Sequence, residues 1–100
     1  MADFIIAVRY TFKEEGGREK AVKEMAESGV LAAIRNEDGC LTYDYYLPAE
    51  DPKSLALYEE WESAAHQKIH MTQPHMKTAL EIMGKYTESV TIKKLTVEEF

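Results

Sequence analysis

The chain has 100 residues, of which 45% are apolar and 30% charged, and its formal net charge at pH 7 is -6. This length suits one domain around one core, and a domain so small gains stability from a partner subunit. The acidic balance repels phosphate backbones and disfavours nucleic acid as a partner. No segment has the pattern of a signal peptide or of a membrane-spanning helix, so we expect a cytoplasmic protein.

The single cysteine, Cys40, cannot form an internal disulfide, which fits a reducing compartment. A reactive thiol would need a nearby base or a helix N-terminus to lower its pKa. The sequence favours a small buried thiol at the start of a strand, because free cysteine is among the most buried residue types.

The first predicted element is a strand from Phe4 to Phe12, where apolar residues recur with a period of two and one face is almost wholly apolar. Charges and two glycines over residues 13–17 end this pattern. A helix from about Arg18 to Asn36 is predicted next. Its apolar positions recur at helical spacing: Ala21, Val22, Met25, Ala26 and Gly29.

Turn residues over 36–39 predict the end of that helix, with Gly39 suited to a left-handed conformation. A second strand is expected from Cys40 to Leu47, because aromatic and β-branched residues are enriched there. Alternation predicts that four side chains share one face of this strand: Leu41, Tyr43, Tyr45 and Leu47.

Two prolines within residues 48–52 predict a hairpin connection to a third strand from Ser54 to Trp61. A helix competes for this segment, which is rich in helix formers. The short length and the neighbouring turn signals favour the strand.

Ser63 is a good N-cap for a short helix over residues 63–71. Pro74 fits the first turn of a further helix over 74–83, which Gly84 would end.

Residues 86–95 predict a long last strand, followed by a short acidic tail over 98–100. The order strand, helix, strand, strand, helix pair, strand is the split βαβ pattern of an α+β ferredoxin-like fold. Four antiparallel strands with helices on one face leave the other face uncovered. If the strand faces that carry Phe4 and Tyr43 are turned toward the helices, the uncovered face carries Ile5, Ala7, Tyr46 and Tyr58. In the opposite arrangement these four residues face the helices. Such a face needs a partner, which predicts a dimeric α+β barrel.

Three groups of residues resemble a known family at these separations. They are Gly39-Cys40-Leu41-Thr42-Tyr43, Tyr58-Glu59-Glu60-Trp61-Glu62-Ser63, and His66. The pattern is similar to that of the antibiotic biosynthesis monooxygenase superfamily over about the whole chain. The resemblance implies a homodimer in which each subunit has a cavity between sheet and helices. The family includes cofactor-independent oxygenases of quinols and polycyclic aromatics, haem-degrading enzymes and isomerases of small phosphorylated diketones.

Trp61 and His66 are the first candidate site residues. Trp61 either forms the wall of an aromatic pocket, as the resemblance implies, or fills the core. His66 has an imidazole suited to moving a proton near neutral pH, and the alternative is a structural histidine at a helix start. We expect His66 to be catalytic. Among the strand tyrosines, Tyr43 and Tyr58 are candidates for orienting a substrate oxygen.

Arg9 is a charge within an otherwise apolar strand, and leaving it buried and unpaired would be costly. It either holds an anionic substrate group or forms a salt bridge across the sheet to Asp44 or Glu60, and we favour the salt bridge. The first strand contains no asparagine, which the haem-degrading branch uses there, so haem degradation is a minority hypothesis.

His70 is a further substrate-binding candidate, because it can share a helix face with His66. With His75 nearby, two histidines could bind zinc or copper, yet a stable site needs at least a third ligand and no ligand motif supplies one. We therefore expect no metal and no other cofactor.

The leading hypothesis is a cofactor-independent monooxygenase of a quinol or another small electron-rich aromatic, with His66 taking or relaying a proton. Phosphate-cradling glycine loops, a nucleophile elbow and a Cys-x-x-Cys pair are absent from the sequence. An isomerase of a small phosphorylated carbonyl compound, held by Arg9 or a lysine, is the alternative, and a basic pocket would favour it. A non-catalytic small-ligand-binding module is the third hypothesis, favoured by a closed core behind Trp61.

Overall fold

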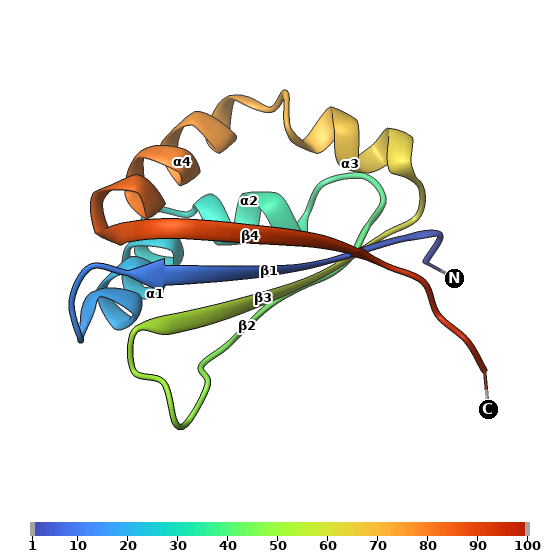
Figure 1. Cartoon of the computed structure of the whole chain (residues 1–100). Helices are drawn as coiled ribbons and strands as arrows, with labels where there is room; N and C mark the ends of the chain where they lie inside the picture. The colour runs from blue at the N-terminus through green and yellow to red at the C-terminus, as the bar shows by residue number, and fades with distance from the viewer. Residues whose placement is uncertain (1, 100) are drawn as a thin grey trace.

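A four-stranded antiparallel sheet carries the helices on one face in the computed structural model, which describes residues 2–99 (Figure 1). Phe100 of the predicted acidic tail lies outside the described residues. The elements are β1 (Phe4–Phe12), α1 (Gly17–Glu27), α2 (Val30–Arg35), β2 (Cys40–Tyr46), β3 (Ser54–Trp61), α3 (Ala64–His70), α4 (Pro74–Tyr86) and β4 (Thr87–Leu95). The strand order β2-β3-β1-β4 confirms the predicted α+β ferredoxin-like fold.

The sheet and the helices enclose one apolar core. β1 pairs with both β3 and β4, so that Val8 lies opposite Leu57 on one side and Ile92 on the other. The strand faces that carry Phe4 and Tyr43 are turned toward the helices, which is the first of the two arrangements considered above. The largest fully buried side chains are Trp61, Phe12, Met25, Ile34, Leu55, Leu57 and His70.

The single helix predicted over 18–36 is two helices, and this prediction was wrong. Gly29 adopts a left-handed φ of 83°, which helical backbone does not allow, and thereby separates α1 from α2. The Ser28 hydroxyl donates to the Met25 carbonyl and accepts from the Val30 N–H, so the break is hydrogen-bonded.

β2 does not place Leu41 with Tyr43 on the core face. The pairing register with β3 shifts between Cys40 and Thr42, and Leu41 is 45% exposed. The shift leaves Tyr43 and Tyr45 on the helix side. Leu47 lies beyond the end of β2 and is also exposed.

α4 continues past Gly84 and ends at Tyr86, so the predicted stop at Gly84 was wrong. Glycine in a helix costs about 1 kcal/mol relative to alanine and does not by itself end a helix. Two hydrogen bonds hold the last turn of α4. The Tyr86 hydroxyl donates to the Glu24 carboxylate of α1, and the Thr87 hydroxyl donates to the Met83 carbonyl.

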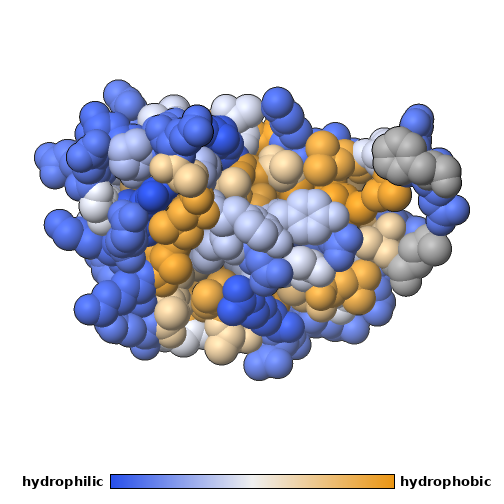
Figure 2. Space-filling view, turned by 90° about the horizontal axis from the view of Figure 1, so that it is seen from below, coloured by the Kyte–Doolittle hydropathy of each residue, from blue (hydrophilic) through white to orange (hydrophobic). Residues whose placement is uncertain are grey.

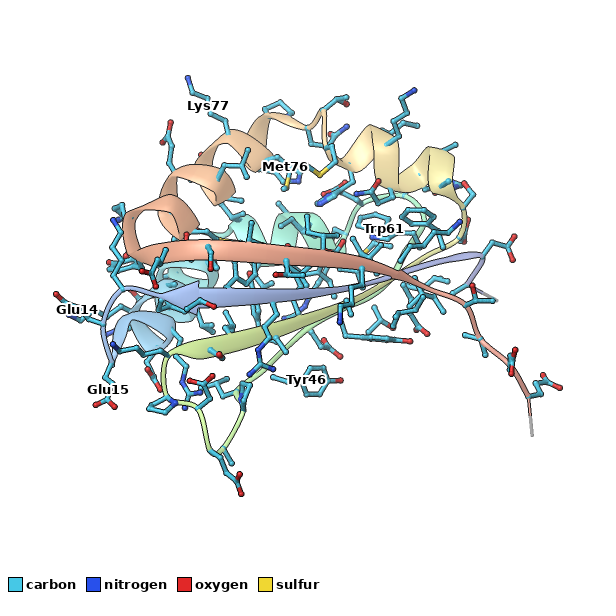
Figure 3. The ribbon with its side chains drawn as sticks, in the orientation of Figure 1. Glu14, Glu15, Tyr46, Trp61, Met76 and Lys77 are labelled. Atoms are coloured by element: carbon cyan, nitrogen blue, oxygen red, sulfur yellow. The ribbon has the colours of Figure 1, made fainter. Side chains whose placement is uncertain are left out.

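No helix or strand of residues 2–99 covers the sheet face away from the helices. Figure 2 looks onto this face and shows apolar patches divided by polar side chains. Ile5, Ala7 and Tyr58 share this face, and Tyr46 points away from the helices below the sheet (Figure 3). Among the described residues, no helix is both long and apolar enough to cross a membrane.

Candidate functional site

Trp61 and Glu59 lie on the helix side of β3, where the alternation that buries Leu55 and Leu57 continues to the end of the strand. The indole Nε1 of Trp61 donates to Glu59 Oε1 at 2.9 Å. The His70 ring at the end of α3 lies against the indole, with 4.6 Å between ring centroids. Figure 3 shows Trp61 between the sheet and α3.

Glu59 is a buried carboxyl group, only 4% exposed. Burial raises its pKa to about 7, and the Trp61 hydrogen bond opposes this effect only in part. Near neutral pH both protonation states of the group are therefore populated, which is what a general acid or base requires.

Three tyrosines extend this layer across the sheet. Tyr43 and Tyr45 of β2 pack edge to face, with ring centroids 6.1 Å apart, and Tyr10 of β1 is partly buried beside the same core. Burial raises the pKa of each phenol, that of Tyr45 to about 12, so all three are neutral donors at pH 7. The Tyr45 hydroxyl is buried without a hydrogen-bond partner among the described residues.

A second group of polar side chains meets on the far side of His70. His70 Nδ1 lies 3.0 and 2.8 Å from the two carboxylate oxygens of Glu37, and His75 Nε2 lies 2.7 Å from Glu37 Oε2. Glu37 belongs to the turn before β2, and His75 to the first turn of α4. The turn and two helices are thus joined by one carboxylate.

The His66 ring lies over the turn at Gly39. Its backbone N–H and Nδ1 contact the Ser63 hydroxyl at 3.2 and 2.7 Å, which confirms Ser63 as the N-cap of α3. Its Nε2 lies 3.5 Å from Asp38 and 3.7 Å from Glu62, two exposed carboxylates. His70, rather than His66, contacts the indole.

Arg9 and Tyr58 lie on the uncovered face of the sheet. Arg9 pairs with Asp51 at 3.4 Å, so the predicted partners Asp44 and Glu60 were wrong. Asp51 lies in the connection between β2 and β3, which returns to the end of β1 where the side chain of Arg9 can reach it. Tyr58 donates to Glu60 at 2.9 Å.

Asp44 and Glu60 are occupied by other partners. Arg35 contacts Asp44 at 3.4 Å, and the hydroxyl of Thr42 donates to Glu60 at 2.7 Å. A hollow of about 390 Å³ beside Arg9 also contains Lys93, but it opens on the face opposite to Trp61.

Of the predicted site residues, the structure thus brings together Trp61, Tyr43 and His70. Arg9 and Tyr58 lie on the opposite face of the sheet, and His66 contacts Asp38 and Glu62 instead. Glu59 and Glu37 were missed by the sequence reasoning. The sequence pattern could have identified Glu59, because the alternation that turns Leu55 and Leu57 toward the core also turns Glu59 inward. No sequence pattern could have identified Glu37, because it contacts His70 only once the chain has folded.

Cys40 begins β2 and packs partly buried against the core, as expected. Burial raises its pKa to about 11, so the thiolate is disfavoured. Cys40 and Tyr43 contribute to a surface hollow of about 220 Å³ at the edge of β2.

Comparison with known proteins agrees with this architecture. The probable quinol monooxygenase YgiN of Escherichia coli K12 is 32% identical over a match that spans 52% of this chain and 58% of YgiN. The chain therefore matches less than two thirds of that relative's length.

Two crystal structures show the same fold. PA3566 from Pseudomonas aeruginosa has a TM-score of 0.82 at 21% identity, covering 99% of this chain and 97% of that one. A monooxygenase from the gene ActVA-Orf6 of Streptomyces coelicolor, in complex with nanaomycin D, also has a TM-score of 0.82, at 20% identity, covering 99% of this chain and 90% of that one. The profile described as antibiotic biosynthesis monooxygenase matches residues 4–82, and the chain therefore belongs to that family.

Proposed function

We propose that the protein is a monooxygenase that oxidises a quinol or another small electron-rich aromatic without an organic cofactor. Family membership and the likeness to a probable quinol monooxygenase support the reaction type. The observation that carries the proposal for this chain is the buried layer of Trp61, Glu59 and tyrosines, which combines aromatic surface with a carboxyl group that titrates near neutral pH.

A quinol can supply the electrons for this reaction itself. One atom of O₂ enters the ring and the other leaves as water, so a hydroquinone and O₂ give a hydroxyquinone and H₂O. Oxygen reacts with the electron-rich anion of the substrate, and the protein's part is to take the phenolic proton and hold the anion.

Glu59 is the proton acceptor that this geometry favours, and the unpaired hydroxyl of Tyr45 is a donor for the substrate oxygen. Trp61 is fully buried with His70 packed against its indole, so it would contact the substrate ring only after His70 moves aside. The hollow at the edge of β2 is lined by Tyr43 but not by Glu59, Tyr45 or Trp61. It is also smaller than the roughly 300 Å³ of common ligand pockets, so an aromatic substrate would have to widen it and displace side chains to reach Glu59. The catalytic role predicted for His66 stays a prediction.

The test is oxygen consumption and product formation with a panel of hydroquinones, using purified protein with no added flavin, nicotinamide or haem. We expect turnover that falls on the order of 100-fold or more in Glu59→Gln. Glu60→Gln is the matched control, because the neighbouring carboxylate points to the opposite face. His66→Ala decides whether that histidine takes part. A folded wild-type protein that turns over no quinol would contradict the proposal and favour the ligand-binding module.

The isomerase alternative has one supporting feature, the hollow that contains Arg9 and Lys93. Its six lining residues contain no histidine or carboxylate to move a proton between carbons, and the histidines lie beyond the sheet. Of the two enzyme hypotheses, the monooxygenase is therefore the better supported, whereas the full burial of Trp61 is the feature that favours a non-catalytic ligand-binding module.

We also propose that the protein acts as a homodimer joined through the uncovered sheet face. The apolar patches of Figure 2 support this, since a lone domain gains little from leaving them in water. A cytoplasmic location stays a prediction, which cell fractionation tests.

A further inference from the structure

Glu37, His70 and His75 offer one carboxylate oxygen and two imidazole nitrogens that all lie within 4.8 Å of one another. We propose that these three side chains bind a divalent first-row transition-metal ion. This inference goes beyond the proposed function and does not depend on it.

The donor set has the right chemistry for such an ion. Neutral imidazole and carboxylate are the ligands of zinc and ferrous sites, and two histidines with one carboxylate are a recurrent combination. Hard cations such as Mg²⁺ prefer oxygen ligands instead. The sequence spacing argued against a metal only because a third ligand was missing, and the fold supplies Glu37.

The three ligand atoms would have to move only a short way to bind an ion. A tetrahedral ion about 2.1 Å from each ligand holds the ligand atoms about 3.4 Å apart. Glu37 Oε2 already lies 2.8 Å from His70 Nδ1 and 2.7 Å from His75 Nε2. Small rotations of Glu37 and His75 would make room for the ion in place of the two bridging hydrogens.

The burial of the three groups suits a persistent site. The side chains of His70 and Glu37 are 2% and 10% exposed, and that of His75 is 23% exposed. His70 and Glu37 therefore form a preformed base, while His75 leaves a path from solvent and room for water as a fourth ligand.

A second cluster provides the internal comparison. Asp38, Glu62 and His66 also converge within 4.8 Å, but this group has one histidine and two exposed carboxylates. Such a set holds a transition metal less firmly, because solvent competes at each ligand and only one imidazole is present.

The test is titration of the chelator-treated full chain with Zn²⁺ and with Co²⁺, followed by calorimetry and by visible absorption of the cobalt form. We expect one ion per chain, with binding weakened on the order of 100-fold or more in His75→Gln. Glu37→Gln should give the same loss. His75 is partly exposed, so its replacement is not expected to unfold the protein, and circular dichroism checks this.

His66→Ala is the matched control and should retain full binding, and Mg²⁺ should not compete. Thermal unfolding gives a second readout: Zn²⁺ should raise the midpoint of the wild type and leave that of His75→Gln unchanged. Failure of the wild type to bind either ion would overturn the proposal, as would binding that survives in both His75→Gln and Glu37→Gln. In that case the three side chains form a hydrogen-bonded network only.

Discussion

Glu59 carries a carboxyl group at a position where the strand pattern calls for an apolar side chain. Its neighbours show why it is tolerated: protonated, it is a neutral group hydrogen-bonded to the indole of Trp61. Ionised, it is a charge in an apolar layer, which is costly unless it is paired. The residue therefore ties the stability of the fold to pH.

Glu59→Gln should remove this dependence. With the folded pKa near 7 against an ordinary value of 4.5, the folded state keeps a proton that the unfolded state releases between these pH values. The contribution of Glu59 to stability is thus fully present below about pH 4.5 and falls as pH rises through 7, by on the order of 3 kcal/mol. Glutamine keeps the acceptor for the indole and cannot ionise.

Urea unfolding of both proteins at several values between pH 5 and pH 8 measures the effect. The variant should gain stability relative to wild type as pH rises. A constant difference over this range would show that Glu59 is ionised at no cost. Glu60→Gln serves as the control on the other face, since hydrogen bonds from Thr42 and Tyr58 hold the pKa of Glu60 below its usual value.

Replacing glycine by alanine at two positions tests what the backbone requires at a turn and within a helix. Gly39 has a φ of +81°, and a Cβ there would lie 2.3 Å from Cδ2 of His66. Gly39→Ala therefore combines backbone strain with a steric clash and should destabilise the protein by about 2 kcal/mol or more. Thermal unfolding measures the loss. An unchanged midpoint would mean that the turn and His66 can both move aside freely.

Gly84→Ala is the opposite case. Gly84 lies in the last turn of α4, and a Cβ there would meet nothing within 4 Å. Alanine favours the helix by about 0.5–1 kcal/mol, so the variant should be more stable than wild type. A drop in the midpoint would indicate that this surface is covered by another part of the assembly.

The elements that alternate strongly were predictable from sequence, and those that depend on tertiary contacts were not. β3 occupies the predicted residues because Leu55, Leu57 and Trp61 bury one face. The break at Gly29 and the passage of α4 through Gly84 required knowledge of which glycine takes a left-handed φ, and sequence alone does not give this. Of the side chains in the candidate site, Trp61, Tyr43 and His70 could be named from the sequence, and their roles stay predictions. Glu37 could not be named, because it comes from a turn 33 residues away from His70.

The whole molecule presents one closed face and one open face. We expect two copies to associate through the open one, and Ala7→Glu tests this by placing a charge near its centre, beside Tyr58 and Lys93. Light scattering coupled to size exclusion should show a dimer for wild type and a monomer for the variant. Lys20→Glu on exposed α1 is a control that should leave the dimer intact. A monomeric wild type would contradict the proposal.

Trp61 is the only tryptophan of the chain, and its indole donates a hydrogen bond to Glu59 and packs at a tilt against the ring of His70. Its fluorescence therefore reports on both neighbours without any added label. Ionisation of Glu59 changes the electric field at the indole. A metal ion bound by His70 changes the charge of the imidazole ring that packs against the indole. Emission followed against pH and against added zinc would thus record two separate events from one chromophore, and the Glu59→Gln and His75→Gln variants would each silence one of them.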